Sequence, residues 1–126
     1  MLKNRRECSV LHVKSKAFAL RIMRLVRHMV QDSNMRSLHD QILRSGTSIH
    51  ANVRESEFAQ SSSDFISKLY IALKETNETL GWLELFHEDG CLDERGFESM
   101  KADCEELLSL LITSIKTKKA NQLSFN

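Results

Sequence analysis

The chain contains no proline and only four glycines among its 126 residues. Proline breaks a helix because it lacks a backbone N–H group and clashes with the preceding turn, and glycine weakens a helix. Nothing in the composition therefore interrupts long helices. Apolar residues make up 41% of the chain, and a chain of this length and composition can bury a core of its own. These features predict a single all-α domain.

Apolar residues recur at helical spacing in four stretches, each of which predicts an amphipathic helix. The four helices are expected at about residues 15–31, 35–58, 64–88 and 94–118. Because the links between them are short, they predict an antiparallel up-down-up-down four-helix bundle. We expect this bundle to occupy residues 14–119, with residues 1–13 as an N-terminal arm and residues 120–126 as a C-terminal tail.

Local signals mark several of the helix ends. Ser15, Ser63 and Asp93 stand where an N-cap side chain would accept a hydrogen bond from the first turn of a helix. Gly90 suits the left-handed position that often follows the last turn. Gly46 lies inside the second expected helix, where glycine is unfavourable, so we expect it to allow close approach of a neighbouring helix.

The formal net charge is only +1, but the charge is unevenly placed. Residues 1–60 hold 11 Lys and Arg against 5 Asp and Glu, whereas residues 61–126 hold 7 against 12. A basic half and an acidic half can attract each other within a bundle or between subunits. Alternatively, the basic half can leave a positive face for a polyanion.

The three cysteines are odd in number and lack the spacing of metal ligands, which favours reduced thiols. The N-terminus has positive charge without the apolar stretch of a signal peptide. No run of residues is long and apolar enough to span a bilayer. We therefore expect a cytoplasmic protein that does not bind a membrane.

A basic stripe on the first two expected helices is the candidate nucleic-acid interface. Arginine offers paired donors to phosphate oxygens, so such a stripe suits a phosphate backbone. The alternative is a solvated helix face whose long side chains cover apolar surface. The candidate contacts are Lys14, Arg21, Arg24, Arg27, Arg44 and Arg54.

Polar residues also border the core at the second helix. Ser48, Asn52 and Glu55 share one side of it, and Glu75 and Glu78 on the third helix could supply their partners. Such a set is either a ligand or catalytic site or a hydrogen-bond network that fixes how two helices pair. We favour the structural interpretation.

The remaining candidates concern a metal site and a subunit interface. Glu84 and His87 form one Glu-x-x-His pair, whereas a di-iron bundle needs two such pairs, so we expect no metal and no cofactor. Trp82 and Phe86 lie in a very apolar stretch of the third helix. That stretch exceeds what one bundle core needs, which predicts a subunit interface there.

The residues 43–55, Leu-Arg-Ser-Gly-Thr-Ser-Ile-His-Ala-Asn-Val-Arg-Glu, resemble the hallmark of a bacterial family of four-helix bundle proteins. This family is associated with intervening sequences in 23S ribosomal RNA genes, and its relatives include accessory proteins of diversity-generating retroelements. The similarity extends over nearly the whole chain from about residue 14 to 118. It also includes residues 15–19, 64–69, 71–75, 78–79 and 82–85.

The resemblance implies a ring of bundles, typically a homopentamer, without enzymatic activity. For the retroelement relatives it implies binding to nucleic acid and to a reverse transcriptase. Two positions depart from the family pattern. His50 stands where a small residue or proline is usual, and Gly81 stands where an aromatic residue often precedes the tryptophan. We expect His50 to add a pH-sensitive contact at the subunit surface.

Two functions follow as hypotheses. The first is a non-enzymatic oligomeric adaptor, pentameric like the family, that binds RNA or DNA through the basic face of the first two helices. A reverse transcriptase would be a protein partner, as for the retroelement accessory proteins. The alternative is a protein-interaction scaffold with no role in nucleic-acid binding.

Overall fold

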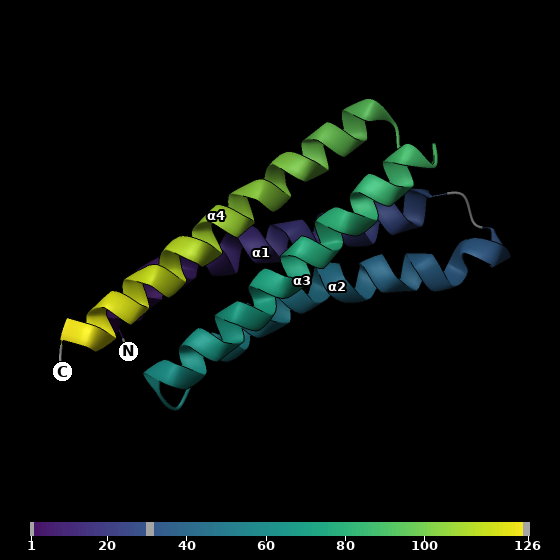
Figure 1. Cartoon of the computed structure of the whole chain (residues 1–126). Helices are drawn as coiled ribbons and strands as arrows, with labels where there is room; N and C mark the ends of the chain where they lie inside the picture. Colours follow the sequence, from purple (N-terminus) through teal and green to yellow (C-terminus); the bar gives the residue numbers. More distant parts are fainter. Residues whose placement is uncertain (1, 30–31, 125–126) are drawn as a thin grey trace.

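Four long α-helices form the chain in the computed structural model (Figure 1). The structure describes the backbone of residues 2–29 and 32–124, and the side chains of residues 10–29 and 32–122. The helices are α1 Leu2–His28, α2 Arg36–Glu57, α3 Ser62–Glu88 and α4 Glu94–Ser124, with a single turn of 3₁₀ helix, η1 Ser33–Met35, before α2. The fold is all-α, as the sequence predicts.

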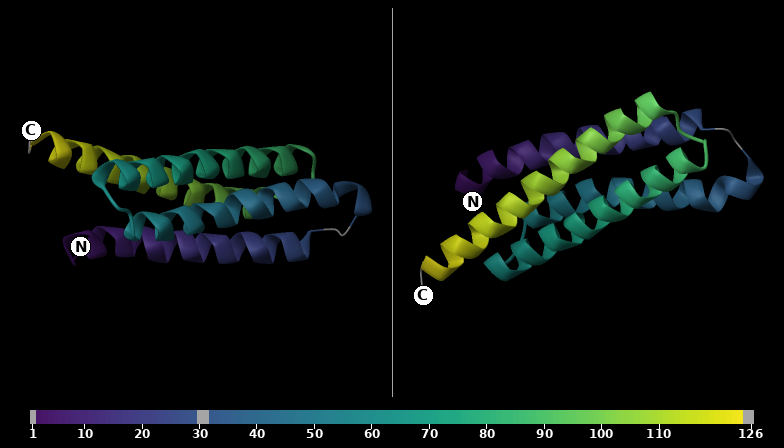
Figure 2. Two further views of the ribbon diagram at one scale, coloured as in Figure 1. Left: turned by 90° about the horizontal axis from the view of Figure 1, so that it is seen from below. Right: turned by 45° about the horizontal axis from the view of Figure 1, so that its top comes forward.

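Helices that are consecutive in the chain pack against each other, and α1 also contacts α4. Figure 2 shows both termini at the end of the bundle where α2 turns into α3, while the other two links lie at the opposite end. Each helix therefore runs antiparallel to the one before it. This arrangement confirms the up-down-up-down bundle.

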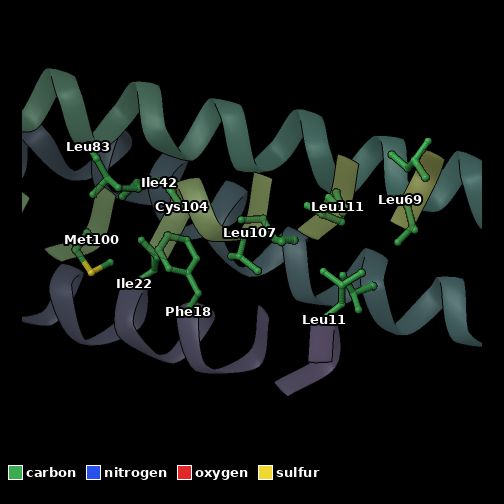
Figure 3. Packing of buried hydrophobic residues seen from close by; sticks show 14 of the residues in the cluster. Leu11, Phe18, Ile22, Ile42, Leu69, Leu83, Met100, Cys104, Leu107 and Leu111 are labelled. Atoms are coloured by element: carbon green, nitrogen blue, oxygen red, sulfur yellow. The ribbon is translucent and has the colours of Figure 1, made fainter. Parts of the chain in front are cut away.

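The core is a stripe of apolar side chains from all four helices, which point toward one another (Figure 3). Its fully buried members recur at helical spacing, so one face of each helix is removed from water. Burying each such side chain stabilises the fold by roughly 1.5–3 kcal/mol. Among them are Phe18, Ile22, Ile42, Ile49, Leu69, Leu83, Leu107 and Leu111.

The helix ends follow the local chemistry. Gly90 has φ +86°, the left-handed conformation expected of it, and the Asp93 carboxylate accepts a hydrogen bond from the Gly96 N–H at 2.7 Å. The N-cap of α3 differs from the prediction. Ser61, not Ser63, accepts the N–H of Asp64 at 3.0 Å, so the helix begins two residues earlier than expected.

The predicted N-terminal arm is wrong, because α1 already begins at Leu2. Leu11 is only 2% exposed and belongs to the core, one turn before Ser15 and two before Phe18. Ser15 is therefore not an N-cap; it lies inside the helix, fully buried. Because the polar Ser15 interrupts the apolar spacing between Leu11 and Phe18, the sequence did not indicate that the helix continues toward the N-terminus.

At the C-terminus, α4 continues to Ser124 instead of ending at the expected residue 118. Lys118 and Lys119 place their amino groups 5.1 and 4.9 Å from the ring centroids of Phe65 and Tyr70 on α3. These contacts hold the last turns of α4 against the start of α3. Residues 120–122 are helical rather than a separate tail, and residues 125–126 of the predicted tail lie outside the described residues.

Gly46 confirms the expected close approach of two helices. A Cβ atom added to it would lie 2.8 Å from Cγ1 and 2.9 Å from Cγ2 of Ile22. Ile22 is itself fully buried, so it has little room to move aside. The glycine thus sets how closely α1 packs on α2.

Candidate functional site

Two of the candidate cations on α1, Lys14 and Arg21, are turned toward α4. The ammonium group of Lys14 lies 3.0 Å from a carboxylate oxygen of Glu106. The guanidinium of Arg21 pairs with Asp103 and also donates to Ser99 Oγ at 2.9 Å. These two cations join the basic half of the chain to its acidic half.

Arg44 makes the corresponding link between α2 and α3. Its guanidinium pairs with the carboxylates of Glu75, at 3.3 Å, and of Glu78. The hydrogen bond to Glu78 is the main reason that the pKa of Arg44 is raised above its usual value. Arg44 is therefore a fixed cation whose charge is already balanced by two neighbours.

The other three candidate cations are exposed and form no ion pair within the described part of the chain. Arg24 and Arg27 lie in the last two turns of α1, whereas Arg54 lies near the C-terminal end of α2. Because α1 and α2 are antiparallel, these two places are at opposite ends of the bundle. The structure does not bring the six candidates together on one face.

The polar residues Ser48 and Asn52 are satisfied within their own helix. Ser48 Oγ donates to the carbonyl of Arg44 at 2.7 Å, and Asn52 Nδ2 donates to the carbonyl of Ser48 at 2.9 Å. Glu55 lies 3.5 Å from the amino group of Lys68. None of these three residues contacts Glu75 or Glu78. The predicted hydrogen-bond network between α2 and α3 is therefore not formed by these residues.

A different pair of hydroxyl groups connects α2 and α3 through the core. Thr79 Oγ1 and Ser45 Oγ lie 2.9 Å apart, and both residues are fully buried. Ser45 also donates to the carbonyl of Ile42, while Thr79 lies 2.8 Å from the carbonyl of Glu75. Every polar atom of this pair therefore has a partner, which suits a structural role.

Trp82 and Phe86 have different environments. Trp82 is half-buried, and its Nε1 donates to Glu78 at 3.2 Å. Phe86 is only 2% exposed and contacts the ring of His39, with centroids 5.8 Å apart. Phe86 therefore belongs to the core of the protomer, which corrects its assignment to a subunit interface.

An apolar surface that the sequence interpretation missed lies on α1. Val10, Val13 and Leu20 are exposed large side chains, and Val13 is 62% exposed. Together with the exposed Ala17, they repeat at alternating steps of three and four residues, so they share one side of the helix. We define Val10, Val13, Ala17 and Leu20 as the outer face of α1. The heptad spacing of these four residues is the sequence signal for this surface. It is difficult to recognise because Val10 and Val13 lie in the predicted arm, whereas Ala17 and Leu20 lie in the first predicted helix.

A second apolar surface lies on α3, on the side away from the core. Leu85 is 57% exposed, and Ile71 is also exposed. Between them, Gly81 faces open space, since an added Cβ would meet nothing within 4 Å. We define Ile71, Gly81 and Leu85 as the outer face of α3. Within the described residues α1 and α3 make no contact, so the two faces belong to diagonally opposed helices.

The sequence profile described as "23S rRNA-intervening sequence protein" matches residues 9–113 of the chain. The chain belongs to this family. The match confirms the resemblance drawn from the sequence. It includes α2, which carries the hallmark segment, and residues 9–13 of the predicted arm.

A solved structure supports the same family assignment. It is a protein of unknown function from the S23 ribosomal protein family of Bacteroides thetaiotaomicron, with 47% sequence identity and a TM-score of 0.83. The match covers 87% of this chain and 98% of that one. Among proteins with curated descriptions, none is significantly similar to the chain.

The two thiols whose side chains the structure describes, those of Cys91 and Cys104, are not activated as nucleophiles. Burial raises the pKa of Cys104 to about 12, and a hydrogen bond with Asp89 raises the pKa of Cys91. Both thiols therefore remain protonated at neutral pH, whereas a nucleophilic cysteine is a thiolate. The side chain of Cys8 lies outside the described residues.

The histidine of the Glu-x-x-His pair makes contacts that stabilise the turn between α3 and α4. The ring of His87 stacks on Phe97, with centroids 4.2 Å apart, and its Nε2 lies 2.7 Å from Glu94. Among the described residues, no three His, Cys, Asp or Glu side chains are grouped so that they could hold a metal ion. Nor does any helix in that part of the chain have the length and apolar character needed to cross a membrane.

Proposed function

We propose that this protein is a non-enzymatic adaptor that assembles with copies of itself through the outer faces of α1 and α3. The observation that carries the proposal is the exposed apolar row on α1. Val10, Val13 and Leu20 stand on the solvent side of a helix whose opposite side fills the core. Aliphatic side chains repeated at heptad spacing are suited to packing against another helix.

Charge complementarity supports a second copy as the occupant. The exposed cations Lys16, Arg24 and Arg27 are close to the outer face of α1, whereas the exposed Glu84 and Glu88 are close to that of α3. The outer face of α3 also carries Gly81, which weakens the helix and has no packing role within the protomer. A helix from another copy could approach the backbone closely at that point.

The diagonal placement of the two faces supports a head-to-tail arrangement. When one patch of a protomer contacts a different patch of the next, the contact is repeated until a ring closes or a filament grows. The homopentamer implied by the resemblance is one such closed ring. We therefore propose a ring, with five copies as the expected number.

The variant Val13→Asp tests this assembly. It places a charge at Val13, the most exposed of the large side chains on the outer face of α1, where an interface would have to desolvate the charge. We expect a loss of the assembly, measured as a fall in molar mass by light scattering, with an unchanged helical circular dichroism spectrum. Because the side chain is exposed in the protomer, folding should change by less than about 0.5 kcal/mol.

Phe58→Asp is the matched control, since Phe58 is 82% exposed at the C-terminal end of α2 and belongs to neither face. This variant introduces the same charge at an exposed apolar position and should keep the wild-type mass. If Val13→Asp retains the assembly while Phe58→Asp loses it, the proposed faces are wrong.

Nucleic-acid binding is a second candidate function, and the free cations of α1 favour it. Arg24 and Arg27 are exposed and one turn apart, without an ion pair in the described part of the chain. Such a pair can contact successive phosphates of RNA or DNA. A reverse transcriptase remains a proposed protein partner, which rests on the family resemblance alone.

The double variant Arg24→Glu with Arg27→Glu tests this candidate. If these arginines contact phosphates, RNA binding is lost in the variant, and binding by the wild type weakens steeply as salt increases. Fluorescence anisotropy of a labelled RNA measures both effects. Arg95→Glu with Lys116→Glu, at two exposed positions of α4, is the control with the same charge change. Equal binding by both double variants contradicts the candidate function.

A further inference from the structure

Two histidines meet between α1 and α2, in the half of the bundle that contains the termini. The rings of His12 and His50 are in edge-to-face contact, with centroids 5.0 Å apart. His12 Nδ1 lies 2.9 Å from Glu57 Oε2, and His50 Nδ1 lies 3.0 Å from Ser15 Oγ. We call His12, Ser15, His50 and Glu57 the histidine cluster. It fastens the first half of α1 to the second half of α2.

The cluster does not have the accessibility of a catalytic site. Ser15 is fully buried, and its hydroxyl group also lies 3.3 Å from the carbonyl of His12. A substrate could not reach this oxygen without separating the helices. What the arrangement provides is a contact between two helices that contains the titratable imidazole of His50.

The surroundings of His50 oppose its protonation. Partial burial is the largest cause that lowers the pKa of His50, followed by the nearby His12, Arg54 and Lys16. Glu57 acts in the opposite direction and is the weakest of these influences. The groups that face His50 thus come from both packed helices: His12 and Lys16 from α1, and Arg54 and Glu57 from α2.

We propose that the histidine cluster is an acid-sensitive latch, which holds the first half of α1 on α2 at neutral pH and loosens it in a mildly acidic medium. Protonation of His50 would place a positive charge against the ring of His12 and beside the two cations Arg54 and Lys16. The proposal goes beyond the proposed assembly and does not depend on it, because it concerns a contact within one protomer. The sequence led us to expect His50 at a subunit surface, whereas it lies between two helices.

The direction of the effect follows from linkage. A histidine whose pKa is lower in the folded state binds fewer protons there than in the unlatched state. The latched state therefore loses stability as the pH falls below about 6.5, the value of a free histidine. The loss is complete once the pH is below the pKa of His50 in the latched state. At pH 5.5 the unlatched population can rise by up to about tenfold.

The test combines a titration of the unmodified protein with hydrogen exchange. NMR of the imidazole protons gives the pKa of His50 directly, and amide protection factors follow residues 12–18 of α1 and residues 76–83 of α3. Between pH 7.5 and 5.5 we expect protection of the α1 amides to fall by up to about tenfold. The α3 amides should change much less.

The variant His50→Gln removes the titrating group and retains a side chain that can hydrogen-bond to Ser15. It should abolish the selective loss of protection in α1. His28→Gln, a change at an exposed histidine at the end of α1, should preserve this selective loss. If His50 titrates at or above pH 6.5, or if the α1 and α3 amides lose protection together, the latch is ruled out. The wild-type titration decides the question even if the His50 variant does not fold.

Discussion

Replacement of Gly46 by alanine is expected to destabilise the protein by up to about 2 kcal/mol. The new Cβ would lie within 3 Å of two carbon atoms of Ile22, which is fully buried. Overpacking of this kind costs about 1–3 kcal/mol, while alanine in place of glycine in a helix returns about 1 kcal/mol. Urea unfolding at a fixed protein concentration measures the difference.

Two controls, Ile22→Ala and Gly81→Ala, show whether the effect of Gly46→Ala comes from its contact with Ile22. In an Ile22→Ala background the two contacts below 3 Å disappear and only the 3.1 Å approach to the Cβ of residue 22 remains, so Gly46→Ala should cost much less or stabilise the protein by up to about 1 kcal/mol. Gly81→Ala should likewise stabilise an isolated protomer, because its Cβ would meet nothing within 4 Å. Equal effects of Gly46→Ala in both backgrounds would show that the α1–α2 approach is not limited by Ile22.

The largest effect at the N-terminal end of the bundle is expected from Leu11→Ala. Leu11 is a core residue in a segment whose sequence suggested an arm. Truncation of a buried leucine removes apolar contacts and leaves a cavity, at a cost of about 2–5 kcal/mol. The midpoint of urea unfolding should therefore fall clearly below that of the wild type.

Val13→Ala provides the comparison, since it lies on the same turn of α1 but on its exposed side. In the isolated protomer it should change the free energy of unfolding by less than about 0.5 kcal/mol. If Leu11→Ala is equally mild, residues 10–13 do not pack on the core, and the helix is only loosely attached there.

The helices themselves could be predicted because apolar residues recur at helical spacing in each of them, and local signals mark the turn between α3 and α4. Gly90 and Asp93 define the turn between α3 and α4 through backbone conformation and capping, which depend on a few neighbouring residues. The start of α1 could not be predicted in the same way. Leu11 belongs to the core stripe, whereas Val10 and Val13 belong to the opposite face of the helix. Because apolar residues of two faces alternate in this short segment, the sequence shows no clear helical period there.

The candidate site was less predictable because charge pairing depends on which helices meet. The sequence shows a basic and an acidic half, but not that Arg21 meets Asp103 on α4 while Arg44 meets Glu75 on α3. These contacts join residues far apart in the chain. They reduce the candidate phosphate contacts on α1 to Arg24 and Arg27. The predicted interface shows the same limit: Trp82 is half-buried, whereas Phe86, one turn later, belongs to the core.

The same limit applies to the histidine cluster. His12 stands in the segment assigned to an arm, and nothing local connects it with Glu57, which lies 45 residues away. Only the pairing of α1 with α2 brings the two together. His50 could be singled out as unusual for the family, but its environment required the packed helices.

The molar mass of the unmodified protein, measured by light scattering at micromolar concentration, tests the central claim most directly. The proposed assembly predicts a single species whose mass is a multiple of the 14.5 kDa chain, with five copies expected. A stable species of 14.5 kDa would contradict assembly through the outer faces of α1 and α3. In that case these faces would have to serve a partner other than a second copy.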